Sequence, residues 1–419
     1  MGEAVAHPPD LSPRLDPRRG TLTIPISTTV EALQSNEVYL PRMRQSLDPV
    51  LSARQINAIR HHQQDTRLMP SPIEQHISLV NKLESLIGAI KFSSEINLRL
   101  ERIELLLDVL GNPQRSYRTI HVGGTSGKGS TSTYISNMLI ADGYKVGMFL
   151  SPYLQVLNEM FIVNGEPAKT HDLLEIYDEI ESFFSKVEKL GFGKPSYFEA
   201  KFAMAMLLFA RNNVDVAVIE VGLGGTLDAT NIIESDIAVL VSVGLDHTEI
   251  LGDTVEKIAL DKVGIIKSTS TVVSGFIQES TKSIALEKAT KVGANLYQIG
   301  QDFSYETYGN TIRIKTLTGF EVAVDSINQP SFAHNLSCAV MAYILFREKL
   351  DSTPCADSIR NAIASFQLAG RFEQVQITPT VILDGAHNGD KIKSLMASIA
   401  LRTENLILIV ATKLGRDLN

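Results

Sequence analysis

The sequence has little cysteine, no excess of basic residues and no long apolar run, and each shortage excludes a class of protein. Among its 419 residues are two cysteines, Cys338 and Cys355, too few for a disulfide framework or a cysteine zinc site, so we expect a reducing, cytoplasmic compartment. The net charge of −8 argues against a general binder of nucleic acid or membrane surfaces. No apolar run reaches the roughly 18 residues of a spanning helix, and the N-terminus has no signal-peptide core. We therefore expect no nucleic-acid or membrane partner, and an anionic substrate would need local positive charge.

The residues that are present fit a globular protein of several parts. Hydrophobic residues make up 44% of the chain and charged residues 21%, enough for two or three domains. Residues 1–70 are polar with little periodicity, and their proline-rich, charged beginning predicts a disordered N-terminal extension. We expect the main body at 71–366 and a smaller unit at 367–419.

The main body alternates predicted strands and helices. The unbroken apolar runs "VDVAVIEVG" and "DIAVLVSVG" are typical of strands buried on both faces of a parallel sheet. Residues 303–324 instead alternate apolar and polar side chains, which predicts antiparallel hairpins. After "LAGRFE", the run "TVILDG", a helix near 389–400 and "ENLILIV" predict a new βαβ unit. The predicted fold class is α/β, a mostly parallel sheet followed by a second small α/β unit.

The stretch "HVGGTSGKGSTST", residues 121–133, places glycines and Lys128 between a strand and a helix. Such a loop cradles phosphates, because backbone N–H groups point inward, the helix N-terminus carries partial positive charge and the lysine adds a full charge. The match to the phosphate-loop pattern is imperfect, since Val122 replaces the first glycine and Gly129 follows the lysine. A flexible glycine turn is the alternative, but the strand–loop–helix context favours a nucleotide phosphate site.

Polar residues follow three of the predicted buried strands. Glu220 ends "VDVAVIEV", Asp246 and His247 follow "IAVLVSVG", and Ser151 follows "KVGMFL". Ligands of open parallel sheets bind beyond the carboxyl ends of strands, and a buried carboxylate there needs a cation. A glutamate that merely caps a loop is the alternative for Glu220. Oxygen and imidazole ligands at one rim suit Mg²⁺ beside phosphates.

Lys262 lies on the inward face of a predicted helix. Asp253 and Glu256 have N-cap and N3 spacing, and the apolar positions that begin at Val255 place Lys262 on the same face. On spacing alone the more common outcome is an ammonium group that snorkels outward to water. If Lys262 is buried instead, it needs a partner or its pKa falls, and a neutral amine is chemically reactive.

The C-terminal unit offers a second group of polar residues. Arg371 in "AGRFE" could clamp a γ-phosphate through two hydrogen bonds, and Asp384 and His387 close a strand at another loop. A surface arginine and a turn-forming Asp-Gly are the alternatives. Together these residues suggest a second wall of one cleft.

A series of motifs then gives the sequence a family resemblance. It resembles folylpolyglutamate synthase/dihydrofolate synthase, in the wider Mur-ligase group of ATP-dependent amide-forming enzymes, from about Ile73 to the last residue. The motifs occur in this order: "LERIELLLDVLGNPQ", "IHVGGTSGKGSTS", "FLSPYL…NEMFIVNGEP", "SYFEAKFAMAMLLFA", "IEVGLGGTLDATNII", "LDHTEILGDTVEKIALDKVGIIK", "AGRFE" and "LDGAHN". The resemblance implies a phosphate-loop ATPase domain, a Rossmann-like C-terminal domain and an active site between them.

The resemblance also implies a role for each matching residue. The ATP phosphates would be held by the loop Gly124, Thr125, Ser126, Gly127, Lys128, Gly129 and Ser130. Mg²⁺ would be held by Ser151, Glu220 and His247, and Lys262 matches a lysine that is carbamylated in such enzymes. Asn335 would contact adenine, Arg371 and Asp384 would grip phosphate and ribose, and His387 would lie near the γ-phosphate.

The implied chemistry is a ligase reaction in two steps. A folate or dihydropteroate carboxylate attacks the γ-phosphate of ATP to give an acyl phosphate, and the amine of L-glutamate then displaces phosphate to form an amide. Catalysis would rest on positioning and on charge neutralisation by Mg²⁺, Lys128 and Arg371. We expect a monomer that acts on small molecules in the cytoplasm.

Some positions depart from the family pattern and leave other functions open. The family's Asn-Glu-Arg motif ends in Met160 here, which removes a charged contact, and Tyr153 stands where the family has histidine. The chain also stops where family members continue, so we expect a partial C-terminal domain. The alternatives are a Mur-type ligase with another acyl acceptor, and a catalytically weakened nucleotide-binding relative.

Overall fold

The computed structural model describes residues 14–15, 22–23, 70–87, 100–309, 311–325, 330–364, 366, 368–386, 389–400 and 407–410. The chain divides between Met69 and Pro70 into two units. In the first unit, Arg14–Leu15 (β1) pairs antiparallel with Leu22–Thr23 (β2), where we predicted no regular structure. The rest of the predicted extension lies outside the described residues.

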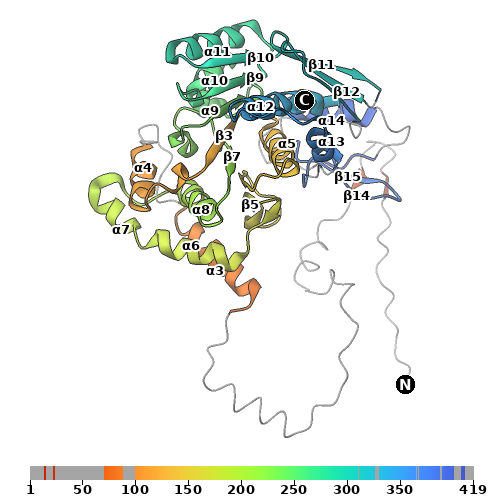
Figure 1. The fold of residues 1–419 in the computed structure, drawn as a ribbon. Helices are drawn as coiled ribbons and strands as arrows, with labels where there is room; N and C mark the ends of the chain where they lie inside the picture. Colours follow the sequence, from red (N-terminus) through yellow and green to blue (C-terminus); the bar gives the residue numbers. More distant parts are fainter. Residues whose placement is uncertain are drawn as a thin grey trace, which may run out of the picture. The chain divides into compact units, whose positions relative to one another are not determined.

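The second unit is built on an eight-stranded sheet (Figure 1). Six neighbouring strands are parallel and two edge strands are antiparallel. In spatial order they are β10 (Asn295–Gln298), β9 (Thr271–Ser274), β8 (Ile237–Leu240), β3 (Arg118–Gly123), β7 (Val216–Glu220), β4 (Val146–Phe149), β5 (Phe161–Val163) and β6 (Glu166–Pro167). Every residue of β4, β7 and β8 is buried, as unbroken apolar runs predict. The predicted α/β class is confirmed.

The strand register brings several chain segments to one edge of the sheet. Val122 pairs with Glu220, Gly123 pairs with Leu240, and Phe149 pairs with Ile219. Because β3, β4, β7 and β8 run parallel in this register, their carboxyl ends lie side by side. The glycine loop and the segments that follow the other three strands therefore share one rim.

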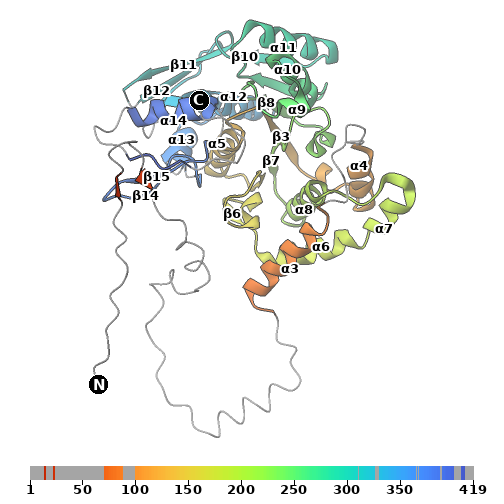
Figure 2. The same ribbon diagram turned by 180° about the vertical axis from the view of Figure 1, so that it is seen from behind.

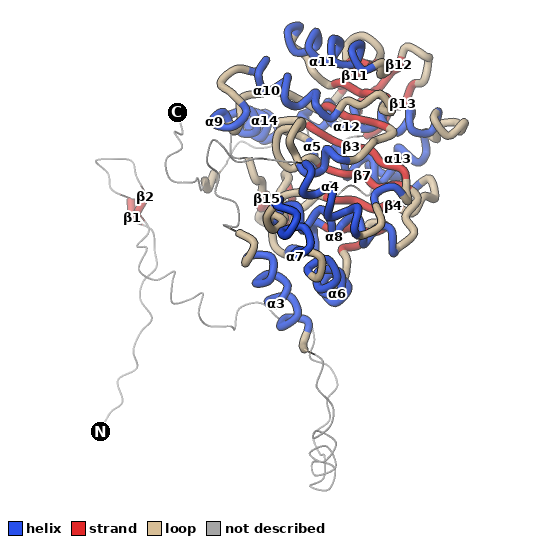
Figure 3. Tube along the Cα trace, turned by 90° about the vertical axis from the view of Figure 1, so that its left-hand side faces the viewer, coloured by secondary structure: helices blue, strands red, loops and turns tan. Residues whose placement is uncertain are grey.

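Helices pack on both faces of the sheet (Figure 3). On one face, α5 (Lys128–Ala141) lies against α12 (Pro330–Glu348) and α13 (Ala356–Ala364), and Figures 1 and 2 both place these three helices together. The Tyr134 ring of α5 stacks on Phe366, with centroids 4.0 Å apart. The same core includes a three-stranded antiparallel sheet, which confirms the predicted hairpins: β11 (Phe303–Tyr308), β12 (Thr311–Thr316) and β13 (Glu321–Asp325).

The opposite face is covered by a second group of helices. Part of this face has its own core, formed with α3 (Pro72–Glu84), α4 (Leu100–Val109), α6 (Thr170–Glu181), α7 (Phe184–Val187) and α8 (Tyr197–Arg211). Beyond it, α9 (Thr248–Leu251), α10 (Val255–Lys262) and α11 (Glu279–Val292) follow β8 and β9. Among the described residues no helix is long and apolar enough to cross a membrane.

The start of α8 is fixed by hydrogen bonds and a buried ion pair. Ser196 caps the helix by accepting a hydrogen bond from the Glu199 N–H, and its own N–H donates to Glu199 Oε2. The same Oε2 lies 2.8 Å from Arg102 Nε of α4, and both side chains are buried. Removing one partner of a buried pair costs about 3–5 kcal/mol, so this contact holds α4 and α8 in a fixed relation.

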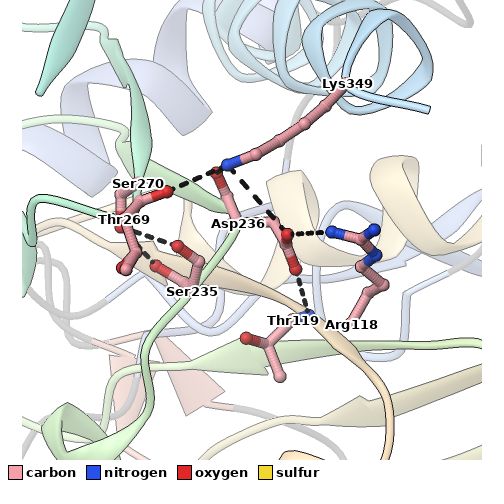
Figure 4. A network of polar contacts seen from close by, with 7 residues as sticks. All are labelled: Arg118, Thr119, Ser235, Asp236, Thr269, Ser270 and Lys349. Carbon is pink, nitrogen blue, oxygen red and sulfur yellow. Dashed lines mark hydrogen bonds and ion pairs between the residues drawn. The ribbon is translucent and has the colours of Figure 1, made fainter. Parts of the chain in front are cut away.

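A polar network fastens the amino ends of the strands, away from the glycine loop (Figure 4). The Asp236 carboxylate accepts hydrogen bonds from Arg118 Nη1 and the Thr119 N–H. Lys349, just beyond α12, donates to the carbonyl oxygens of Asp236 and Thr269. These bonds tie the beginnings of β3, β8 and β9 to α12, which supports the opposite rim without taking part in it.

The C-terminal unit differs from the predicted βαβ unit. Val381–Leu383 (β15) and the helix Gly389–Ala400 (α14) occur as predicted, but β15 pairs antiparallel with Glu373–Gln376 (β14). The prediction of a strand over "ENLILIV" is wrong for its described part, because residues 407–410 form no strand. The short connection at 377–380 brings β14 and β15 together as a hairpin, a pairing that needs no crossover.

Candidate active site

The glycine loop follows β3 and is held in place before any ligand binds. Its N–H at Ser126 donates to Ser242 Oγ, and the Thr125 hydroxyl donates to the Gly244 carbonyl. Gly127 has φ +83°, and a Cβ there would collide with Asn335 Oδ1, so this position needs glycine. The structure therefore brings Asn335 directly against the loop, as a shared nucleotide site requires.

Lys128 opens helix α5 and faces the rim. Its Nζ donates to the Gly124 carbonyl at 3.1 Å and lies 3.9 Å from Glu220 Oε1. The first-turn N–H groups of α5, including those of Gly129 and Ser130, have no carbonyl within the helix to bond, which makes this end a site for anions. Within the described part of the chain, the buried Ser126 hydroxyl has no hydrogen-bond partner either. Loop, lysine and helix end together offer donors and positive charge.

Glu220 brings a carboxylate to the same point. The side chain is 4% exposed, and its Oε2 accepts a hydrogen bond of 3.1 Å from the Ser151 N–H. The predicted residues Lys128, Ser151 and Glu220 thus lie together, contributed by the neighbouring strands β3, β4 and β7. A buried carboxylate beside one lysine, with a serine next to it, is an oxygen-rich environment suited to a hard divalent cation.

His247 is partly exposed and has a local contact of its own. It precedes α9 with φ +50°, its side chain is 46% exposed, and its Nδ1 lies 3.9 Å from Glu249 Oε1. In the part of the chain that the structure describes, no three His, Cys, Asp or Glu side chains gather as a metal site. Ser151 and Glu220 therefore fit a magnesium site, and His247 would have to turn toward them to join it.

Lys262 is buried, so the expectation that it snorkels outward is wrong. The side chain is 4% exposed because the glycine loop after β7 covers it: a Cβ on Gly225 would lie 2.8 Å from Lys262 Cα. Burial, and after it the positive charge of Lys128, lower the pKa of Lys262 to about 7, against the opposing effect of Asp261 and Asp246. A neutral amine is therefore available near neutral pH, close to the phosphate loop.

The predicted cap of this helix is also wrong. Thr254, not Asp253, is the N-cap of α10, and its hydroxyl accepts a hydrogen bond from the Lys257 N–H. Asp253 pairs with Lys257 Nζ instead, at 2.8 Å. Both residues are good caps, and the sequence alone does not fix which of two adjacent ones leaves the helix first.

Sequence reasoning missed two carboxylates of the site. Asp228 is 7% exposed, and it accepts hydrogen bonds from the N–H groups of Leu223 and Thr230, which shapes the loop over Lys262. Burial raises the pKa of Asp228. Asp261 lies next to Lys262, and its buried Oδ2 has no hydrogen-bond partner among the residues that the structure describes. The only signal in the sequence was an Asp two residues before a threonine, which reads as a turn.

Arg371 and Asp384 lie together at the start of the C-terminal unit. Asp384 Oδ2 accepts a hydrogen bond from the Phe372 N–H, and Oδ1 accepts one from the Ala386 N–H, so both carboxylate oxygens bind backbone N–H groups. Arg371 Nη1 donates a hydrogen bond to the Gly370 carbonyl. This unit rests on the segment that follows β4, since a Cβ on Gly370 would lie 2.8 Å from Leu154 Cδ2. His387 lies outside the described residues.

Comparison with known proteins shows the family to which the chain belongs. Residues 122–341 match the Mur ligase middle domain. The dihydrofolate synthase/folylpolyglutamate synthase of Bacillus subtilis is 31% identical over 345 residues, which cover 79% of this chain and 78% of that protein. The chain belongs to the folylpolyglutamate synthase/dihydrofolate synthase family.

Solved structures of this family share the fold. A folylpolyglutamate synthase in complex with AMPPCP and folate matches with a TM-score of 0.71 and 29% identity, covering 78% of this chain and 82% of that one. The Mycobacterium tuberculosis folylpolyglutamate synthase complexed with ADP matches with a TM-score of 0.71 and 29% identity, covering 78% and 74%. The match to the Mur ligase middle domain, residues 122–341, includes the glycine loop, Ser151 and Glu220.

Proposed function

We propose that this chain is an ATP-dependent carbon–nitrogen ligase of folate metabolism that joins L-glutamate to a folate or dihydropteroate carboxylate. The observation that carries the proposal is the convergence at one rim of Lys128, Glu220 and Ser151, with the Lys128 and Glu220 side chains 3.9 Å apart. Relatives named for this activity, one of them bound to both AMPPCP and folate, support it.

The first step transfers a phosphoryl group. An oxygen of the substrate carboxylate attacks the γ-phosphorus of ATP, the bond to ADP breaks, and an acyl phosphate forms. In the proposed arrangement Gly124–Ser130 bind the phosphates through backbone N–H groups, and the Lys128 ammonium neutralises the charge that builds up between the β- and γ-phosphates. Arg371 would approach the γ-phosphate from the C-terminal unit.

The second step forms the amide. The α-amine of L-glutamate attacks the acyl carbon and loses a proton, and inorganic phosphate departs with the oxygen that came from the carboxylate. His387, near the γ-phosphate in the proposed arrangement, is the third predicted catalytic residue beside Lys128 and Lys262. Packing of the C-terminal unit against Leu154 supports a role in keeping water from the acyl phosphate.

The remaining site residues bind the nucleotide and a metal ion. Asn335, which contacts Gly127, would bind the adenine, and Asp384 the ribose. Mg²⁺ would be held by Ser151, Glu220 and His247, and it would supply positive charge to the phosphate oxygens. The buried Glu220 carboxylate and the adjacent Ser151 support this assignment.

Lys262 is proposed to carry a carbamate. Its neutral amine adds to CO₂ through a new N–C bond and releases one proton, which converts a neutral buried side chain into an anion. The lowered pKa near 7 supports this reaction, because the neutral amine is the reactive form. The carbamate would then provide a further oxygen ligand for a cation at the rim.

The test is glutamate-dependent release of ADP. The purified chain is assayed with Mg²⁺, ATP and L-glutamate, with dihydropteroate, tetrahydrofolate or other carboxylic acids as acceptor. We expect ADP only when both glutamate and a pteridine acceptor are present, and none from Lys128→Ala, which should no longer bind ATP. ADP release with a different carboxylate would identify another acyl acceptor, and nucleotide binding without glutamate-dependent turnover would contradict a ligase.

The cytoplasmic location and the monomeric state stay predictions. Cys338 and Cys355 are both free thiols, which suits a reducing compartment. Light scattering of the purified chain measures its molar mass in solution, which should equal the mass of one chain.

A further inference from the structure

Helix α8 carries a buried cation beside the active-site rim. Lys201 is 6% exposed, and its Nζ lies 3.8 Å from the centre of the Tyr197 ring, 5.9 Å from that of Phe198 and 3.6 Å from Met160 Sδ. In the described part of the chain it forms no ion pair, although a buried ammonium group ordinarily requires an anion. Aromatic faces and a thioether compensate only part of the lost hydration.

The carboxylates nearest in sequence are engaged elsewhere. Glu199, on the same helix, pairs with Arg102 and bonds the Ser196 N–H. Glu159, next to Met160, accepts three backbone hydrogen bonds, from the N–H groups of residues 154–156. Neither group pairs with Lys201 in the described part of the chain, so a bound carboxylate is suited to supply the negative charge.

The position of this lysine connects it to the proposed site. Phe198 packs against the glycine loop after Glu220, since a Cβ on Gly222 would lie 2.5 Å from the Phe198 ring. The Tyr197 hydroxyl lies near the side chain of Tyr153, which is two residues beyond Ser151. Lys201 is therefore surrounded by residues contiguous with the rim.

Two of these neighbours, Met160 and Tyr153, are among the positions at which the sequence departs from the motifs of the family it resembles. Met160 lies beside Lys201, and Tyr153 lies beside Tyr197. Met160 and the aromatic side chains carry no charge, so Lys201 is the charged residue of this group.

We propose that Lys201 binds a substrate carboxylate and thereby helps to select the substrate. The inference rests on the proposed function, which needs two carboxylate-bearing substrates, the acyl acceptor and L-glutamate, next to the phosphate loop. Burial lowers the pKa of Lys201 to about 8, so the ammonium form still predominates at pH 7 and can pair with a carboxylate.

The test measures binding and turnover of Lys201→Met, which keeps length and removes charge. Equilibrium dissociation constants for folate, for L-glutamate and for ATP are measured by calorimetry, beside KM and kcat where turnover occurs. We expect binding of one of the two carboxylate ligands to weaken about 10-fold or more, with ATP binding unchanged. Whichever ligand responds identifies the carboxylate that Lys201 holds.

Control variants separate this role from a structural one. Lys186→Met, at an exposed lysine of α7, should leave all three dissociation constants unchanged, and Lys201→Arg should restore most of the lost affinity because it keeps the charge. If Lys201→Met fails to fold, Lys201→Gln replaces it. Thermal unfolding reports folding, and the midpoint should rise when a buried unpaired cation is removed.

The outcomes also separate this inference from the proposed function. Unchanged affinity of Lys201→Met for both carboxylates overturns the role of Lys201 even if the chain is an active ligase. Weakened carboxylate binding in a chain without glutamate-dependent turnover supports Lys201 and overturns the ligase. Wild-type protein that binds neither carboxylate overturns both.

Discussion

At the scale of single residues, three buried charges define the rim: Glu220, Lys262 and Lys201. Glu220 lies near Lys128, and Lys201 faces the ring of Tyr197. The pKa of Lys262 is lowered by burial and by the charge of Lys128, and raised by those of neighbouring aspartates. Buried charges are costly, so a fold that keeps several of them near one rim is suited to charged ligands. A triphosphate, a divalent cation and two carboxylates supply the charges that match.

The burial of Lys262 predicts a pH-dependent stability. Its pKa is about 7 in the folded chain and 10.5 when exposed, so between these values the unfolded state binds more protons and stability rises with pH. Replacing Lys262 by Met removes this effect. We expect Lys262→Met to be more stable than wild type below pH 7 and the difference to narrow by roughly 1.4 kcal/mol per pH unit from pH 7 to 10.5.

The measurement is urea unfolding in CO₂-free buffer at several pH values. Lys257→Met, at an exposed position of the same helix, serves as control and should show a small, constant difference. If the free energies of unfolding of Lys262→Met and wild type differ by the same amount at every pH, the lowered pKa of buried Lys262 is contradicted. In turnover assays the same variant should bind nucleotide normally and react slowly, as loss of a carbamate requires.

At the scale of elements, the site is made by loops that follow parallel strands. In the glycine loop and in the loop over Lys262, an added Cβ at Gly127 or Gly225 would collide with a neighbour. Such loops are rigid, and they place donors and charges before a ligand arrives. Their glycines serve close approach as well as unusual backbone angles.

Gly127 and Gly143 separate these two demands. Both have positive φ, +83° and +91°, but a Cβ at Gly127 would strike Asn335 whereas Gly143 has nothing within 4 Å. We expect Gly143→Ala to cost about 1 kcal/mol of stability and to leave ATP binding unchanged. Gly127→Ala should destabilise the chain further and weaken ATP binding by about 10-fold or more, because the loop must move away from Asn335. Equal ATP affinity of the two variants would show that ATP binding does not depend on the close approach of the glycine loop to Asn335.

The sequence predicted strands and helices better than it predicted caps and pairings. Buried parallel strands such as Val216–Glu220 are unbroken apolar runs, which few other elements produce. The choice between Asp253 and Thr254 as cap, and of β14 as the antiparallel partner of β15, depends on contacts that no local pattern encodes. These differences arise from tertiary packing rather than from propensity.

At the scale of the whole molecule, the sheet supports chemistry at one rim and is fastened at the other. The Asp236 network ties the amino ends of the strands (Figure 4), and the carboxyl ends carry Lys128, Ser151 and Glu220. Pattern and spacing indicated that polar residues would meet at this edge, because neighbouring parallel strands end together. The burial of Lys262 could not be predicted, and neither could the packing of Lys201 against Tyr197, Phe198 and Met160. Each depends on a loop or helix distant in sequence.

The central claim is that one site activates a carboxylate with ATP and passes it to glutamate. Its most direct test uses an acceptor labelled with ¹⁸O in the carboxylate, with the released phosphate analysed by mass spectrometry. The account predicts one ¹⁸O atom in each phosphate, released only when L-glutamate is present, because the acyl phosphate carries that oxygen away. Unlabelled phosphate would mean that water, not the carboxylate, attacks ATP, and would contradict the proposed reaction.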